Sequence, residues 1–254
     1  MIPAPSLQSI TDRLSQQLPR RITIEKREPI HEYGFMTTFQ TNQSIRYQTV
    51  RIKESRNSKL VGILFCHPKT PLAKTEIVDQ LPHFHERSGE AVDFFCAGYG
   101  AYWPPQHFAD QKVVTSINGE KWLFSEKAFS QVIDELETET QWIYSGETEL
   151  ILVNAVKKNS DEAELDFHSA IVCNLEVMFQ AKAFTSVRAF FTDIFLYAKT
   201  HSENDPTWGL SDSKGLSVGN SALLEAVLSL LPKSLSDAYR SGKHYAVRNI
   251  ARNL

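Results

Sequence analysis

The spacing of apolar residues near the start of the chain predicts a short amphipathic helix. Apolar residues recur at helical intervals at Leu7, Ile10 and Leu14. Ser6, just before them, is a typical N-cap residue, and Pro19 is a typical helix terminator. We therefore expect a helix that begins after Ser6 and ends at Pro19.

The next stretch is typical of short strands. Runs at residues 22–25, 35–39 and 45–52 are rich in residues that favour strands. In the last run Ile45, Tyr47 and Thr49 alternate with other side chains, which is the pattern of a half-exposed antiparallel strand. The sequence thus predicts a β-rich N-terminal section.

Three continuous apolar runs lie in the centre of the chain, at residues 61–66, 91–97 and 149–154. Such runs are expected of strands covered on both faces. Amphipathic helices are predicted between them, one after Thr70 that Pro82 closes or kinks, and one after Ser125. Strands that alternate with helices favour a central, mostly parallel sheet flanked by helices, so we expect the α/β class.

From Asp166 onward the pattern predicts helices. Phe167 and Ile171 begin one apolar stripe, and residues 187–195 form a broader one. Further helices are expected after Asn220 and from residue 234 to the end. With this helical C-terminal half, residues 1–254 are interpreted as one α/β domain. The alternative is a division into an α/β part at 1–156 and a helical part at 165–254.

Composition indicates an ordinary globular protein, since 42% of the residues are hydrophobic and 22% are charged. The three cysteines are far apart, and no Cys/His cluster has the spacing of a zinc site, so we expect neither a metal nor a cofactor. Free cysteines favour a reducing compartment, hence the cytoplasm. We expect no membrane segment, because charged and polar residues interrupt the most apolar stretch, 187–198.

The segment 83–89 is the first candidate site. It combines His83, His85, Glu86 and Arg87, with Asp93 at the next strand, and these residues can supply a general base, an acid and an anion clamp. However, ligands in parallel sheets lie beyond the carboxyl ends of the strands, and this segment precedes a strand. The two histidines also do not share one helix face. A structural or partner-docking role is the favoured interpretation.

The second candidate site follows two apolar strands at the edge where ligands are expected. Its residues are His67 and Lys69 after the first strand, and Tyr99, Tyr102 and Trp103 after the second. If these strands are neighbours, the side chains line one cleft, where the aromatic rings stack on a base or sugar. The alternative is an aromatic loop that packs over the core.

Charge is distributed unevenly along the chain, although the formal net charge is only −3. The first quarter and the end are basic, and the middle is acidic. Two basic ends that meet in space would form a face for an anionic partner such as nucleic acid. The favoured alternative is that they balance the acidic middle, within the molecule or across a subunit interface.

Two segments, HFHERSGEAVDFFCAGYG and WIYSGETELIL, resemble segments of uncharacterised bacterial proteins, some from defence loci. The resemblance implies an antiviral-defence context, and it assigns a role to no residue.

Two hypotheses for function follow. The first is a non-catalytic interaction or regulatory subunit of a larger bacterial intracellular assembly, with a protein partner or a second copy of itself. It rests on the missing catalytic motifs, the segregated charge and the aromatic segments around Trp103, Trp122, Trp142 and Trp208. The second is an enzyme or sensor for a nucleotide-like or other small anionic ligand at the carboxyl edge of the sheet. The missing motifs favour a protein that is not an enzyme.

Overall fold

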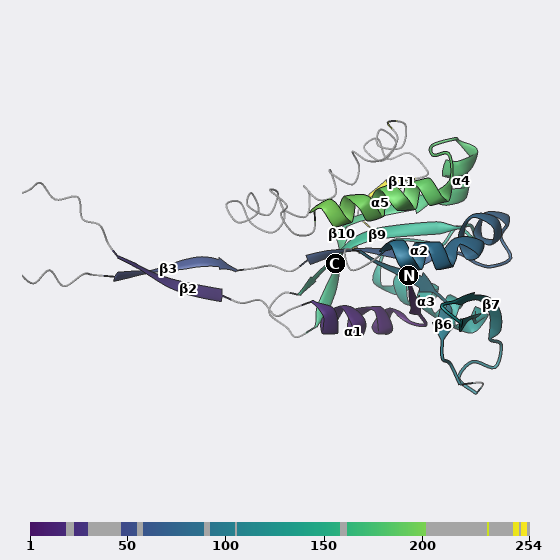
Figure 1. Cartoon of the computed structure of the whole chain (residues 1–254), viewed down its shortest axis with the longest axis horizontal. Coiled ribbons are helices and arrows are strands. Elements are labelled where there is room, and N and C mark those ends of the chain that lie inside the picture. The colour runs from purple at the N-terminus through teal and green to yellow at the C-terminus, as the bar shows by residue number, and fades with distance from the viewer. Residues whose placement is uncertain are drawn as a thin grey trace, which may run out of the picture.

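The computed structural model describes residues 1–18, 23–29, 47–54, 58–88, 92–104, 106–157, 162–201, 233, 246–248 and 250–252. Their central feature is a six-stranded sheet in the order β1-β5-β4-β9-β10-β11 (Figure 1). The strands are β1 (Ile2–Ala4), β4 (Ser58–Phe65), β5 (Asp93–Ala97), β9 (Glu149–Lys157), β10 (Ala163–Asn174) and β11 (Ala246–Arg248).

The sheet is mixed. Strands β1, β5 and β4 are parallel to one another, whereas β9 is antiparallel to β4 and β10 is antiparallel to both β9 and β11. The α/β class is confirmed, but the prediction of a mostly parallel sheet holds only for β1, β5 and β4. The reason is that β9 is buried along its whole length, and a run buried on both faces has the same composition in either direction.

Helices cover both faces of this sheet. On one face, α1 (Leu7–Gln17) contacts α3 (Glu126–Glu139), and Phe129 of α3 packs against Phe65 of β4. On the other face, α2 (Leu81–Ser88) contacts α5 (Val187–His201), and Phe94 of β5 packs against Phe195 of α5. Figure 1 shows α1 and α5 on opposite sides of the strands.

The helix after Ser6 is confirmed. Ser6 Oγ accepts a hydrogen bond from Ser9 N, and Leu7, Ile10 and Leu14 are buried. The helix predicted after Ser125 is α3, which Ser125 caps through Ala128 N. Both starts were predictable because an N-cap acts locally, through one side chain and the first turn.

The chain between Pro71 and Ser88 stays helical beyond Pro82, so of the two predicted effects of Pro82, closing the helix or kinking it, closing is wrong. A π-type segment, η1 (Ala73–Ile77), and a 3-10 segment, η2 (Val78–Gln80), precede α2. These irregular turns place Pro82 in the first turn of α2, where its missing N–H is not needed. Residues 83–88 therefore belong to a helix and not to a connecting loop.

The helix predicted from Asp166 is wrong in its first part. Residues up to Asn174 form β10, and only α4 (Leu175–Gln180) and α5 beyond it are helical. A shift of register between Asp166 and Ile171 breaks the alternation of β10, so its apolar residues imitate helical spacing. Residues 246–248, expected in a basic helix, form β11 instead. The helix expected after Asn220 lies outside the described residues.

Two smaller sheets accompany the main one. In the first, β2 (Thr23–Pro29) pairs antiparallel with β3 (Tyr47–Glu54), and the pair projects from the body of the molecule (Figure 1). These strands confirm in part the β-rich N-terminal section, and the predicted strand at 35–39 lies outside the described residues. The second sheet consists of β6 (Tyr99–Ala101), β8 (Glu120–Phe124) and β7 (Lys112–Ile117).

Most buried apolar side chains of the described residues form one cluster, which reaches from Met1 to Ile250. The division of the chain into one or two domains stays a prediction. Within the described part of the chain, no helix has the length and apolar character that crossing a bilayer requires.

Candidate functional site

At the carboxyl edge of the sheet, where the sequence predicted a cleft, both ring nitrogens of His67 have hydrogen-bond partners. Its Nδ1 accepts a hydrogen bond from Lys69 N at 3.1 Å, so Nε2 carries the proton and donates to Glu126 Oε1 at 2.9 Å. The ring also packs edge-on against Phe124 and Phe129. His67 thus connects the end of β4 to the start of α3.

Glu126 receives two basic groups at this edge. Lys69 Nζ lies 3.5 Å from its second oxygen. Partial desolvation opposes ionisation of Glu126, but the hydrogen bond from His67 and the charge of Lys69 hold its pKa below the usual value. Lys69 is exposed, and in this arrangement its charge faces a carboxylate.

Tyr99 and Trp103 do not line the predicted cleft. Tyr99 is fully buried, donates its hydroxyl to Cys66 O at 2.8 Å, and has a pKa raised by that burial. Trp103 lies directly over Gly100 and packs against Phe108, with 4.7 Å between ring centroids. For these two residues the alternative of an aromatic loop over the core describes the structure.

The residues of the first candidate site are divided between two surfaces. Glu86 and Arg87 are exposed on α2. His83 packs against Phe84, and desolvation together with the nearby Arg188 and Arg87 lowers its pKa. His85 and Asp93 instead line a pocket that the sequence did not predict.

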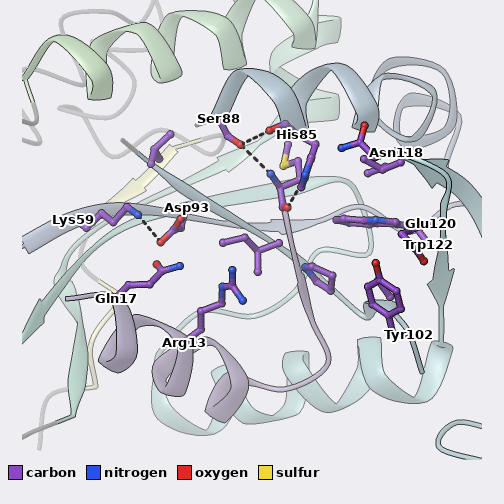
Figure 2. A pocket seen from close by; sticks show the side chains of 16 residues that line it. Arg13, Gln17, Lys59, His85, Ser88, Asp93, Tyr102, Asn118, Glu120 and Trp122 are labelled. Carbon is purple, nitrogen blue, oxygen red and sulfur yellow. Dashed lines mark hydrogen bonds and ion pairs between the residues drawn. The ribbon is translucent and has the colours of Figure 1, made fainter. Parts of the chain in front are cut away.

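This pocket has a volume of about 890 Å³, within the usual range for small-molecule sites. Figure 2 shows Arg13 and Gln17 entering it from α1, His85 and Ser88 from α2, and Tyr102, Asn118, Glu120 and Trp122 from the region of the three-stranded sheet. We call it the Arg13 pocket. Lys59 and Asp93 stand near the first residues of β4 and β5, so the pocket lies at the amino ends of the parallel strands and not at their carboxyl ends.

Lys59 and Asp93 form an ion pair in the wall of the Arg13 pocket. Lys59 Nζ lies 2.9 Å from Asp93 Oδ2, and the two side chains are 17% and 6% exposed. The contact is close enough for an ion pair but lacks the alignment of a hydrogen bond. The half-buried Lys59 compensates the charge of the buried Asp93, which alone would carry a large desolvation cost.

His85 is oriented by the backbone of β1. Its Nδ1 lies 2.9 Å from Met1 O, a carbonyl that can only accept, so Nδ1 carries a proton. Ser88 Oγ accepts from Met1 N at 2.9 Å and donates to His85 O at 3.2 Å. In the neutral ring Nε2 is therefore the basic nitrogen, and Ser88 is not aligned as a nucleophile for it.

Helix α1, which carries Arg13 and Gln17, is held at both ends. At its start, Leu7 N donates to Glu135 Oε2 of α3 at 2.6 Å. At its end, the buried Lys157 Nζ of β9 donates to Ser15 O at 2.8 Å and to Leu18 O at 3.4 Å. These contacts fix the backbone from which the exposed Arg13 side chain reaches the pocket.

Tyr102 is the most unusual residue of the Arg13 pocket. Its side chain is 76% exposed, and its φ of 62° lies in the left-handed region that non-glycine residues rarely adopt. Desolvation and the nearby Glu120 carboxylate raise the pKa of Tyr102. Strained backbone of this kind is found preferentially at binding sites.

Thiol and metal chemistry find little support in the described residues. Cys66, Cys96 and Cys173 are free and buried, and burial raises the pKa of Cys96 and of Cys173 to about 12. Among the residues that the structure places, no group of His, Cys, Asp and Glu is arranged to hold a metal ion.

The two basic ends of the sequence are described only in part. Arg13 and Lys59 both line the Arg13 pocket. Arg252 donates to two carbonyls at the end of α3, those of Glu137 in its last turn and of Thr140, its C-cap. Arg20, Arg21, Arg46, Arg56, Arg240 and Lys243 lie outside the described residues.

Comparison with known proteins adds no relative: no family model, no curated protein and no solved structure matches this chain. The interpretation of the Arg13 pocket therefore rests on its own geometry.

Proposed function

We propose that this chain is a non-catalytic regulatory protein that binds a small anionic ligand in the Arg13 pocket. The single observation that carries the proposal is Arg13 itself, an exposed guanidinium at a pocket of ligand size, with no ion-pair or hydrogen-bond partner among the residues that the structure describes. A guanidinium offers five donors in a planar fork that suits carboxylate and phosphate groups. The fixed ends of α1 support this role, because they limit the motion of its backbone.

The same proposal includes an intracellular setting and a larger assembly. Three free, buried cysteines support a reducing compartment such as the cytoplasm. The projecting β2–β3 pair supports a protein partner, because an isolated two-stranded sheet is at best marginally stable in water. The bacterial defence context, and nucleic acid as a partner, stay predictions.

One observation favours a second function, an enzyme that acts on the same ligand. His85 Nε2 is the basic nitrogen of a ring fixed through Nδ1, as in a general base. His85→Gln distinguishes the two functions. If the protein is regulatory, the wild-type chain binds the ligand without converting it. If it is an enzyme, the wild-type chain converts the ligand and His85→Gln does not.

The first experiment is native mass spectrometry of the protein purified gently from its own host. We expect a retained small molecule that is lost in Arg13→Gln. Arg87→Gln is the matched control, because it removes an exposed arginine of α2 that does not line the pocket. Retention of the same mass by Arg13→Gln, or the absence of any retained mass together with no thermal stabilisation by pyrophosphate or adenosine diphosphate, contradicts the proposal.

A further inference from the structure

The charged side chains of the Arg13 pocket compensate one another except at two places. Lys59 and Asp93 form an ion pair. The Met1 nitrogen donates to Ser88 Oγ at 2.9 Å. Among the charged side chains that line the pocket, Arg13 and Glu120 remain, and Glu120 lies beside Tyr102 (Figure 2).

These two charges stand on different sides of the pocket. Arg13 comes from α1, whereas Glu120 comes from the start of β8, and Figure 2 shows Glu120 beside Trp122 and Tyr102 and away from Arg13. Arg13 and Glu120 are both exposed, and neither forms a salt bridge with another residue in the described part of the chain. A bound molecule would therefore meet a positive group at one end and a negative group at the other.

The ligand is not expected to bind as an added strand. Gly98 N donates to Ala4 O, so the backbone N–H and C=O of Ala4 point toward β5. The backbone groups of the preceding residue, Pro3, therefore point the other way, toward the open side of β1. Proline has no N–H to offer to an added strand. Recognition must then come from side chains, and the two uncompensated charges are the strongest ones available.

On the basis of the proposed function, we infer that the ligand is a zwitterion, with a carboxylate or phosphate bound by Arg13 and an ammonium group bound by Glu120 beside the Tyr102 ring. The exposed ring of Tyr102 favours a cation, because its π face attracts positive charge. The volume of about 890 Å³ accommodates a molecule longer than one amino acid. Short peptides and phosphorylated amines share this chemistry.

The test uses probes from which each charge is removed separately. Tetra-alanine, its N-acetyl form, its C-terminal amide and phosphoethanolamine are titrated into the wild-type protein by isothermal calorimetry. We expect acetylation or amidation to weaken binding about tenfold, the usual scale for one charge-assisted contact in a partly exposed site. Tighter binding of phosphoethanolamine than of tetra-alanine would identify phosphate as the anionic group.

Two substitutions assign each end. Glu120→Gln should abolish the difference between the free and the acetylated amine, and Arg13→Gln should abolish the difference between the acid and the amide. Glu86→Gln and Arg87→Gln, exposed residues of α2 outside the pocket, are the matched controls and should preserve both differences.

The outcomes separate this inference from the proposed function. If Arg13→Gln releases the ligand retained from the host but neither Glu120→Gln nor acetylation of the probe changes binding, the zwitterion is wrong and the anion site stands. A wild-type protein that binds none of the zwitterionic probes at about 10 mM also overturns the inference. If Arg13→Gln changes nothing in either experiment, both ideas fail.

Discussion

Gly100 shows how a single missing side chain organises the loop after β6. A Cβ at this position would lie 1.9 Å from Trp103 Cε2, inside the indole ring. The close approach lets Trp103 cover β6, and it directs Trp103 away from the pocket that the neighbouring Tyr102 enters. At the scale of single residues, packing decides which of two adjacent aromatic side chains is available to a ligand.

We expect Gly100→Ala to destabilise the protein by about 1–3 kcal/mol, because the new methyl group must displace the Trp103 ring. The measurement is urea unfolding followed by circular dichroism. In a Trp103→Ala background the same change should cost much less, since the ring with which it collides is gone. Equal costs in the two backgrounds would show that Trp103 is not the obstacle.

Asp110 holds the start of α3 together with Ser125. Its carboxylate accepts from Ser125 Oγ at 2.8 Å and from Lys127 N at 3.0 Å. Slight desolvation opposes ionisation, but these hydrogen bonds outweigh it and hold the pKa of Asp110 below its ordinary value of 3.8. A carboxyl group with a lowered pKa stabilises the fold above its ordinary pKa, and this stability is lost as the pH falls through the lowered value.

Asp110→Asn should therefore reduce the loss of stability between neutral pH and about pH 3, while Ser125→Ala should cost about 1 kcal/mol at neutral pH. The measurement is the free energy of unfolding in urea at a series of pH values. Asp79→Asn, an exposed aspartate in η2, is the control and should leave the pH profile unchanged. A profile of Asp110→Asn that matches the wild type would refute the role of Asp110 at this helix start.

At the scale of elements, α1 illustrates how one helix depends on distant partners. Its residue Ser15 would normally offer its carbonyl to the N–H of residue 19, but residue 19 is a proline and has none. The buried Lys157 of β9 supplies the missing donor. A positive group at the C-terminal end of a helix also interacts favourably with its dipole.

Lys157→Met should destabilise the protein by about 1–3 kcal/mol, because the last carbonyls of α1 lose their donor. It should also weaken ligand binding in the Arg13 pocket, since α1 positions Arg13. Hydrogen exchange should become faster in α1 and stay unchanged in α3. Lys74→Met, which alters an exposed lysine of η1, is the control. Wild-type exchange in α1 would contradict the role of Lys157.

At the scale of the whole molecule, the Arg13 pocket gathers residues that are far apart in sequence. Of the predicted candidates, His85, Asp93 and Tyr102 lie in it, while Arg13 and Lys59 were recognised only as members of a basic segment. Gln17, Asn118 and Glu120 had no sequence signal of function. Asn118-Gly119 did carry one signal of structure: both residues have positive φ, as in the tight turns typical of a hairpin such as β7–β8.

The sequence by itself determined the features that act over a few residues. The Ser6 and Ser125 caps, the apolar strands and the buried stripe of α1 are visible in it, because capping and side-chain periodicity are local. The amphipathic spacing around Phe167 misled because a shift of register between Asp166 and Ile171 breaks the alternation of β10. The apolar spacing of one segment does not reveal how that segment pairs with its partner strand.

Only the tertiary structure decided the direction of β9, the burial of Tyr99 and the position of the pocket. Strand direction depends on how the chain returns to the sheet, and a run buried on both faces is compatible with either direction. The pocket forms where α1, α2 and the three-stranded sheet meet beside β1. Its charged side chains form a site only because the fold brings these elements together, since Coulomb interactions depend on distance in space and not on separation along the chain.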